Sequence, residues 1–407
     1  MGNPAFSVLS RSGELAAAAA EPLDVLVVGM GATGAGVALD AASRGLRVAV
    51  LDKGDIASGT SSKSSKLVHG GLRYLENYEF GLVREGVVER QVLLTIAPHL
   101  VRPMDFLYPV WPDTAKRRLL GLGLATYDVF AFASLAGRSG STRRHERLSA
   151  EEAVALAPAL DGSELAYAYR YGDCATDDAR LVLAVVQAAR RYGALTVTYA
   201  EVTGLTQTEG RVDGALVEDR LTGERVTLRA RYVVNATGVW VDVLQGHEEP
   251  GREAVVQPSK GVHVVVPSER LPLKGASVLL PSMQGDGRSM FAIPWGRQTI
   301  LGTTDTPYDG SLEDLSLTAH DLEYVLAAGN AVFHRDLRPD DVLGAWAGVR
   351  PLIRNAGSSS MSDISRRHSL TEGSGGLLTI TGGKLTTYRR MAKDVVDRIV
   401  ERDDRRA

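Results

Sequence analysis

A short apolar run that leads directly into three spaced glycines constrains the fold of this chain more than any other feature. Val25 to Val28 is entirely apolar, as expected of a parallel strand that is buried on both faces of a sheet. Gly29, Gly31 and Gly34 follow at once in the pattern Gly-x-Gly-x-x-Gly. Glycines at this spacing allow a tight turn and a close approach of another group to the main chain. The sequence therefore predicts a strand, a tight turn and a helix.

The residues after the turn complete a larger pattern. Ala35 to Arg44 has a helical composition and stops at Gly45, and Arg47 to Leu51 predicts a second strand with Asp52 at its end. In such a βαβ arrangement the helix N-terminus faces a pyrophosphate, and the acid binds a ribose hydroxyl. A glycine-rich turn without a ligand is the simpler alternative, but the complete spacing favours dinucleotide binding. The motif alone does not separate FAD from NAD.

The composition limits the class of protein and its surroundings. Of 407 residues 44% are hydrophobic, and 46 Lys and Arg against 49 Asp and Glu give a net charge of −3, so we expect a globular protein without a global attraction to nucleic acid. The single cysteine, Cys174, excludes an internal disulfide and favours a reducing, cytoplasmic location. The apolar segment Leu119 to Gly137 contains Asp128 and is too interrupted to span a membrane. Residues 1–21 are expected to form a flexible leader.

A stretch rich in hydroxyl groups follows the second strand. Residues 60–66, Thr-Ser-Ser-Lys-Ser-Ser-Lys, run without a linker into Leu-Val-His-Gly-Gly-Leu-Arg-Tyr-Leu at residues 67–75. A solvated Ser/Lys loop is the plain alternative. The hydroxyls can instead bond the pyrophosphate and ribityl chain of a flavin, which would bring His69 and Arg73 toward the flavin ring.

The segment Gly59 to Arg90, GTSSKSSKLVHGGLRYLENYEFGLVREGVVER, resembles the FAD-dependent glycerol-3-phosphate dehydrogenases. Further segments resemble the same family in the family's order: Ala97–Leu100, Asp173-Cys174 with Asp177–Leu181, Val234–Gly238, Lys260–His263, Gly302–Asp305, Gly348–Leu352 and Gly382–Tyr388. Bacterial and mitochondrial members of the family usually continue into a further helical domain. Here one helix, Thr387–Val400, and a charged tail are expected in its place.

The resemblance implies an α/β fold of the D-amino-acid-oxidase and glycine-oxidase type. We expect a discontinuous Rossmann-like FAD-binding domain over residues 22–90, 160–250 and 345–407, and an antiparallel-sheet substrate domain over residues 91–159 and 251–344. Local patterns agree with this division. Asp178 to Arg191 predicts a helix, and short strand candidates occur at Val262–Pro267, Ser277–Pro281, Met290–Pro294 and Gln298–Gly302.

An alcohol carbon can transfer a hydride only if its hydroxyl proton also leaves, so the expected site needs a base that titrates near neutrality. Histidine is the natural type. His69 is the first candidate because it lies in the loop expected to pass the flavin, and His263 is the second. A hydrogen-bonded scaffold role is the alternative for each.

A phosphomonoester is best matched by the paired donors of arginine. The candidates for binding the phosphate are Arg73, Arg350 and Arg366, supported by Lys384 and Tyr74. Arg366 stands beside Arg367, so a solvated surface role competes with binding. Arg350 is flanked by apolar residues, Gly and Pro, a poor context for a merely solvated charge.

The residues expected to bind FAD lie in the first turn, in the hydroxyl-rich stretch and in three later places. They are Gly29, Gly31, Thr33, Gly34, Asp52, Lys53, Thr60, Ser61, Ser62, Ser65, Lys66, Leu67, His69, Val202, Gly238, Gly383, Lys384, Leu385 and Thr386. Lys384, or the helix N-terminus after Gly382-Gly383, can alternatively stabilise negative charge on the reduced flavin. No metal is expected.

The expected reaction is oxidation of sn-glycerol 3-phosphate to dihydroxyacetone phosphate, with hydride passing to N5 of FAD and electrons going on to a quinone. Gly121 to Thr126 lacks the third glycine of a second nucleotide motif, so the electrons should come from the substrate rather than from NADPH. The alternatives are a glycerol-3-phosphate oxidase using O2, an amine or amino-acid oxidase, and a catalytically impaired flavoprotein.

The expected partners beyond the substrate are a quinone and a second copy of the chain in a homodimer, without nucleic acid. Lys116-Arg117-Arg118 directly before an apolar segment also suggests a peripheral contact with the inner face of the cell membrane. An ordinary core helix is the alternative for that segment.

Overall fold

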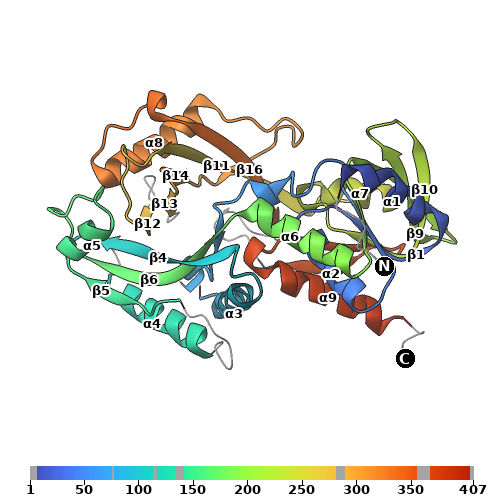
Figure 1. Ribbon diagram of the computed structural model, residues 1–407, viewed down its shortest axis with the longest axis horizontal. Helices are drawn as coiled ribbons and strands as arrows, with labels where there is room; N and C mark the ends of the chain where they lie inside the picture. Colours follow the sequence, from blue (N-terminus) through green and yellow to red (C-terminus); the bar gives the residue numbers. More distant parts are fainter. Residues whose placement is uncertain are drawn as a thin grey trace. The chain divides into compact units, whose positions relative to one another are not determined.

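Two units, each assembled from separate stretches of the chain, make up the protein (Figure 1). Unit 1 comprises residues 1–62, 178–258 and 349–407, and unit 2 comprises residues 63–177 and 259–348. The computed structural model describes residues 7–75, 78–112, 117–133, 142–280, 289–354 and 367–403, with the main chain alone at residues 73, 117–119 and 133.

Unit 1 combines helices with a mostly parallel sheet; 3-10 helices are marked η. Its elements are η1 (Val8–Ser10), α1 (Arg11–Ala20), β1 (Leu23–Val28), α2 (Ala32–Ser43), β2 (Val48–Leu51), η2 (Thr60–Ser62), α6 (Asp178–Arg191), β7 (Leu195–Val197), β8 (Ala200–Thr208), β9 (Arg211–Asp219), β10 (Arg225–Asn235), η4 (Gly238–Trp240), α7 (Val241–Glu248), β17 (Ser369–Glu372), β18 (Leu378–Thr381), η7 (Leu385–Thr387) and α9 (Tyr388–Glu401).

The sheet of unit 1 ends where the glycine motif begins. Its strand order is β17-β18-β10-β1-β2-β7, and the five strands from β18 to β7 run parallel. Val25 to Val27 of β1 are fully buried, as the apolar run predicts. α2 packs against α6 and α9, whereas α1 packs against β7 and β10. In parallel sheets of this kind ligands bind beyond the carboxyl ends of the strands, and Gly29 follows the carboxyl end of β1.

The prediction of a flexible leader over residues 1–21 is wrong for residues 8–20, which form η1 and α1. Leu15 and Ala18 of α1 are buried against the sheet. The guanidinium of Arg11 donates to both carboxylate oxygens of Asp219, each at 2.8 Å, and to the carbonyl of Tyr199 at 2.9 Å. The alanine-rich sequence of α1 carries little periodicity, which is why its buried face could not be recognised.

The pair between Arg11 and Asp219 should make stability depend on pH. The hydrogen bonds from Arg11 lower the pKa of Asp219 below its ordinary value, although burial opposes this. The pair therefore contributes its full stability above the ordinary aspartate pKa of about 3.9, and this is lost as pH falls from there through the lower folded-state pKa. We expect Asp219→Asn to reduce the free energy of unfolding at pH 7 by about 1.5–3 kcal/mol, measured with urea. The deficit should shrink at pH 3, and an equal deficit at both pH values would contradict this assignment.

Unit 2 contains a large mixed sheet with helices on its two faces. Its elements are β3 (Leu67–Val68), η3 (Leu72–Leu75), α3 (Phe80–Ile96), β4 (Val101–Val110), α4 (Arg117–Ala133), β5 (Glu146–Leu148), α5 (Ala150–Leu156), β6 (Tyr167–Thr176), β12 (Ala276–Leu280), β13 (Met290–Trp295), β14 (Gln298–Gly302), β15 (Thr306–Pro307), α8 (Ala319–Phe333) and η5 (Pro339–Asp341). Two strands cross between the units: β11 (Val256–Pro267) and β16 (Gly344–Ile353). Among the described helices, none has both the length and the hydropathy to cross a bilayer.

The sheet of unit 2 has two distinct apolar faces because side chains alternate along each strand. The strand order is β15-β11-β14-β13-β12-β4-β6-β3, antiparallel except between β12 and β4. Val264 and Leu301 belong to the cluster that α8 covers (Figure 1). Val265 and Ile300, one residue away in each strand, belong to a second cluster with Phe106. This second face is rich in aromatic side chains.

The observed units divide the chain differently from the predicted domains. Residues 63–90 and 160–177, predicted for the FAD-binding domain, lie in unit 2. The reason is strand pairing, because β3 and β4 both pair with β6 and so draw these segments into the second sheet. The hydroxyl-rich stretch is consequently shared, with Ser62 in unit 1 and Lys63 in unit 2.

Candidate active site

The turn after β1 accepts only glycine at two positions. Gly29 has a left-handed φ of 102°, and a Cβ there would lie 2.5 Å from the carbonyl oxygen of Ala236. A Cβ on Gly34 would lie 1.8 Å from the carbonyl oxygen of Gly29. These two glycines therefore let the main chain fold closely on itself and against Ala236, which is the tight turn that the motif predicts.

An acid and a hydroxyl lie at this same turn. Asp52 accepts hydrogen bonds from the amides of Met30 at 2.7 Å and Gly54 at 2.9 Å. Burial raises the pKa of Asp52 above its ordinary value, and these two backbone donors oppose the shift. The Ser61 hydroxyl accepts from the amide of Ala32, the first residue of α2, at 2.9 Å. The structure thus brings two predicted FAD residues, Asp52 and Ser61, to the glycine turn.

A second group of predicted cofactor residues gathers around α9. The Thr33 hydroxyl of α2 lies 3.8 Å from the sulfur of Met391. Gly383 is left-handed, with φ 72°, and a Cβ there would lie 2.4 Å from the same sulfur. Lys384 is half-buried at the start of η7, and Thr386 is buried within it. Met391 therefore joins two segments that are far apart in sequence.

Trp240 contacts Lys53, a predicted cofactor residue, and was missed by the sequence prediction. The Lys53 ammonium lies 4.3 Å from the centre of the Trp240 ring, within the range of a cation–π contact. Gly238, two residues earlier, is left-handed with φ 63° and begins η4. Val202 of β8 instead packs beside the apolar core and pairs with Val217 of β9. A sequence signal for Trp240 would have been its place just after the small-residue turn at the end of β10.

The chain passes between the units at residues 62–63 and again at residues 348–349, and these two places are in contact on both sides of the boundary. In unit 1 the Thr60 hydroxyl donates to the carbonyl of Val349 at 2.6 Å. In unit 2 a Cβ on Gly348 would lie 2.6 Å from the Cβ of Lys63. Arg350 follows directly in β16 and is half-buried. Ser62, the last residue of unit 1 before the crossing, is also half-buried.

In unit 2 a row of residues across three strands carries the histidine candidates. His263 of β11 is opposite Gly302 of β14, and Gly302 is opposite Phe291 of β13. A Cβ on Gly302 would lie 2.4 Å from the ring of His263, so this glycine makes room for the imidazole. The His69 ring meets Phe291 edge to face at 6.4 Å. The two histidines thus share one row of the aromatic face.

His263 is held on several sides, whereas His69 is partly open. His263 is 2% exposed, its Nε2 lies 2.8 Å from the Ser65 hydroxyl, and its ring stacks on Trp346 at 4.9 Å. The Lys66 ammonium lies 5.2 Å from the centre of the same indole. His69 is half-buried. A proton acceptor must reach its substrate, so His69 remains the first candidate for the base and His263 the second.

The remaining predicted residues are placed as follows. Tyr74 is buried in the apolar cluster between η3, α3 and α4, which favours a core role over substrate binding. Leu67 belongs to β3, and Leu385 begins η7. Arg73 is described by its main chain alone, in η3, and Arg366 lies outside the described residues. The aromatic residues Phe291 and Trp346 escaped the sequence prediction because a single aromatic side chain in a strand carries no motif.

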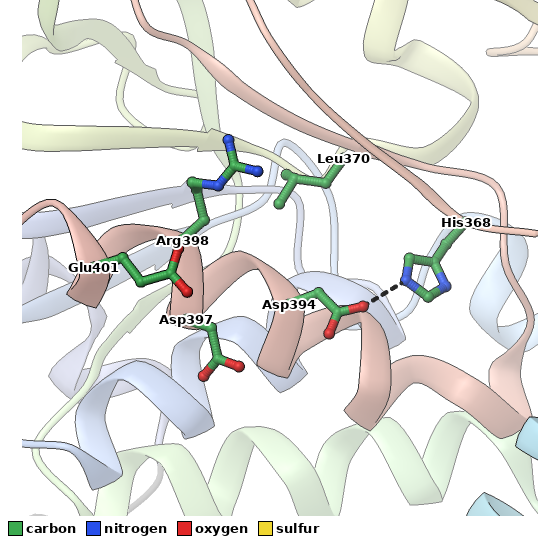
Figure 2. A pocket seen from close by; sticks show the side chains of 6 residues that line it. All are labelled: His368, Leu370, Asp394, Asp397, Arg398 and Glu401. Atoms are coloured by element: carbon green, nitrogen blue, oxygen red, sulfur yellow. Dashed lines mark hydrogen bonds and ion pairs between the residues drawn. The ribbon is translucent and has the colours of Figure 1, made fainter.

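A surface pocket in unit 1 is lined by other residues (Figure 2). His368 and Leu370 line it together with Asp394, Asp397, Arg398 and Glu401 of α9. Two of its acids have local partners, because Asp394 lies 2.8 Å from Nε2 of His368 and Asp397 accepts from Arg44 at 2.8 Å. None of the predicted site residues lines this pocket, so we do not place the reaction there.

The family model described as FAD dependent oxidoreductase matches residues 24–389. The chain belongs to this family. The predictions of an FAD cofactor and of an oxidase-type α/β fold are thereby confirmed. The tight glycine turn after β1, with Asp52 and Ser61 beside it, fits such a dinucleotide.

Several relatives of this family member carry a more specific name. Glycerol-3-phosphate dehydrogenase 2 of Mycobacterium tuberculosis is 42% identical over 382 residues, which are 94% of this chain and 63% of that protein. The aerobic glycerol-3-phosphate dehydrogenase of Bacillus subtilis is 40% identical over 99% of this chain and 71% of its own length. The predicted resemblance is confirmed, and the chain spans somewhat less than two thirds of the mycobacterial relative.

Solved structures agree. The glycerol-3-phosphate dehydrogenase of Bacillus halodurans, complexed with FAD, matches with a TM-score of 0.78 and 34% identity over 98% of this chain and 68% of that one. The glycine oxidase of Geobacillus kaustophilus, at 22% identity over 94% and 95% of the two chains and a TM-score of 0.68, shows the same fold.

Proposed function

We propose that this chain oxidises sn-glycerol 3-phosphate to dihydroxyacetone phosphate with FAD as the hydride acceptor. The observation that carries the proposal is identity of about 40% to relatives named glycerol-3-phosphate dehydrogenase along nearly the whole of this chain. The histidine row of unit 2 and the nucleotide turn of unit 1 supply the side chains that this chemistry needs.

The residues have separate tasks in this proposal. Gly29, Gly31 and Gly34 admit the pyrophosphate of FAD to the main chain, and Asp52 binds the ribose. When bound, FAD supplies an acceptor for the hydride that leaves the C2 carbon of the substrate. His69 takes the proton of the C2 hydroxyl as the carbonyl bond forms.

The phosphate of the substrate needs a fixed positive charge. Arg350 is the candidate with a described side chain in a segment of the predicted motif, and Arg73 and Arg366 remain predictions from the sequence. Lys384 can support either the phosphate or the charge on the reduced cofactor. A quinone, which takes up two electrons and two protons to become a quinol, is the proposed final acceptor.

An anaerobic visible spectrum of the purified holoprotein tests the proposal. Bleaching of the flavin band by glycerol 3-phosphate, followed by recovery with a soluble quinone, is the expected result. A band that glycerol 3-phosphate leaves unchanged while glycine or another amine bleaches it would overturn the proposal in favour of an amine oxidase. Reoxidation by O2 with peroxide at the turnover rate would instead assign an oxidase, and a band that no substrate bleaches would assign an impaired flavoprotein.

Arg350→Ala tests the phosphate assignment. Loss of charge-assisted hydrogen bonds is expected to raise the KM for glycerol 3-phosphate by about 10- to 100-fold. The flavin content should stay that of the parent because the variant leaves the nucleotide turn intact. Steady-state kinetics with the flavin content measured in parallel check this, and an unchanged KM would remove Arg350 from the phosphate site.

We also propose a peripheral contact of α4 with an anionic bilayer. Leu124 and Tyr127 are buried on one side of α4, yet Leu122, Val129 and Phe132 on its other side are 58–66% exposed. A helix that is apolar on both sides normally has a partner for each. The guanidinium of Arg144 lies 4.4 Å from the Phe132 ring centre, which gives this apolar stripe a basic neighbour suited to anionic lipid.

Flotation with vesicles tests this contact. The protein should float with phosphatidylglycerol vesicles at low salt, and Leu122→Gln with Val129→Gln should abolish flotation. Leu216→Gln, at an exposed apolar position of β9 in unit 1, is the control. Equal flotation of all three proteins would overturn the contact. The homodimer expected from the sequence stays a prediction.

A further inference from the structure

A buried polar cluster in unit 2 joins one residue from each of three elements. Arg90 of α3, Tyr127 of α4 and Asp173 of β6 are 0%, 2% and 2% exposed. Nη1 of Arg90 lies 2.5 Å from Oδ1 of Asp173, and the Tyr127 hydroxyl donates to Oδ2 of Asp173 at 2.7 Å. A charge this deeply buried is costly unless it is paired and hydrogen-bonded, and here both conditions are met.

The cluster is hydrogen-bonded to the main chain next to His69. The amide of Gly70 donates to the Tyr127 hydroxyl at 2.9 Å, with Oδ1 of Asp173 at 3.3 Å. Arg90 also donates to this hydroxyl, at 3.3 Å, and to the carbonyl of Gly172, at 3.1 Å. The Tyr127 hydroxyl thus accepts a hydrogen bond from the Gly70 amide while it donates one to Asp173.

The loop fits closely between the two helices that carry the cluster. A Cβ on Gly70 would lie 2.5 Å from the Tyr127 hydroxyl and 2.5 Å from a methyl of Val87 on α3. A Cβ on Gly86 of α3 would lie 2.9 Å from the carbonyl oxygen of Gly70. Gly70 is therefore enclosed by α3 on one side and by Tyr127 on the other, one residue from the proposed base.

The network keeps its donors fixed across the working pH range. Burial, together with the adjacent Asp173, raises the pKa of Tyr127 well above its ordinary value. The hydroxyl therefore remains protonated and continues to donate to Asp173. Its lone pairs stay available to the Gly70 amide.

We propose that Tyr127, oriented by the Arg90–Asp173 ion pair, is a positioning residue that fixes the His69 main chain through the amide of Gly70. Replacement of buried ion pairs by apolar residues is often neutral for stability, so a role in stability alone does not account for this arrangement. The proposal rests on the assignment of His69 as the base, and it extends that assignment to residues that contact neither substrate nor cofactor.

Tyr127→Phe in the holoenzyme tests the proposal because it removes one hydroxyl and keeps the ring. Hydrogen exchange of the Gly70 amide, followed by mass spectrometry on overlapping peptides, is expected to be about tenfold faster than in the parent protein. The kcat for glycerol 3-phosphate should fall about 10- to 100-fold with KM changed less than about twofold, because only the base is displaced. Tyr324→Phe on α8, at a half-buried tyrosine in the cluster on the opposite face of the sheet, is the matched control and should change neither quantity.

The possible results distinguish a failure of the positioning role of Tyr127 from a failure of the proposed function. Unchanged Gly70 exchange in Tyr127→Phe, or faster exchange with unchanged kcat, overturns the positioning role. If the variant does not fold, hydrogen exchange of the Gly70 amide in the parent protein still tests the proposal. Exchange as fast as that of an unprotected amide would overturn it. If glycerol 3-phosphate does not reduce the flavin of the parent protein, the proposed function is overturned instead. The exchange measurements would still test whether Tyr127 holds the Gly70 amide.

Discussion

Replacing His69 with glutamine is expected to lower kcat for glycerol 3-phosphate by about 10²- to 10⁴-fold while FAD stays bound. Glutamine keeps a polar side chain of similar reach but cannot accept a proton near neutral pH. The substitution removes the edge-to-face contact with Phe291 at a half-buried position, and we expect the fold to stay intact. The rate of flavin reduction under anaerobic stopped-flow conditions measures the effect directly, since no later electron transfer enters it.

His263→Gln is the comparison that decides between the two histidines. His263 is bonded to Ser65 and stacked on Trp346, so its replacement should act mainly on stability and on the shape of the aromatic face. We expect its kcat to fall far less than that of His69→Gln. A larger fall for His263→Gln, with a near-normal rate for His69→Gln, would exchange the two assignments.

The second large effect is expected at the nucleotide turn. Gly34→Ala should weaken FAD binding by more than about 100-fold, because a Cβ 1.8 Å from the Gly29 carbonyl oxygen forces two backbone segments apart. The affected atoms belong to main chain, which cannot rotate away as a flexible side chain would. Titration of the apoprotein with FAD, followed by quenching of flavin fluorescence, measures the dissociation constant.

Gly246→Ala on α7 is the matched control for this substitution. A Cβ built there meets no atom within 4 Å apart from its own helix, so the change is sterically free and should leave FAD binding unaltered. Gly34→Ala protein that is purified with a full complement of tightly bound FAD would contradict the steric argument. Loss of FAD binding in both variants would point to a general effect of altered helices instead.

The sequence predicted the nucleotide turn well because its signal is local. β1, α2 and β2 lie within three residues of the predicted strand, helix and strand, and Asp52 directly follows β2 as expected. The helix predicted from Asp178 to Arg191 is confirmed with the same bounds. In each case the required pattern lies within about thirty consecutive residues, so spacing alone identifies it.

The division into units and the surroundings of the histidines depend on distant pairings. The pairing of β3 with β6 draws Leu67 and its neighbours into unit 2, and no local pattern reports this. His263 and Phe291 share a row only because β14 lies between their strands with a glycine at the crossing point. Likewise Tyr127 was part of an apolar segment considered for a membrane, and only tertiary packing shows its contact with Gly70.

The order in which the chain is synthesised has a consequence for acquiring the cofactor. The glycine turn at residues 29–34 emerges from the ribosome early, but α2 packs against α9, which ends at Glu401. Gly36 of α2 faces the ring of Tyr388, and Thr33 lies against Met391. A nascent chain therefore carries an unsupported nucleotide turn until α9 has been synthesised. Stable capture of FAD should begin only when α9 has left the exit tunnel.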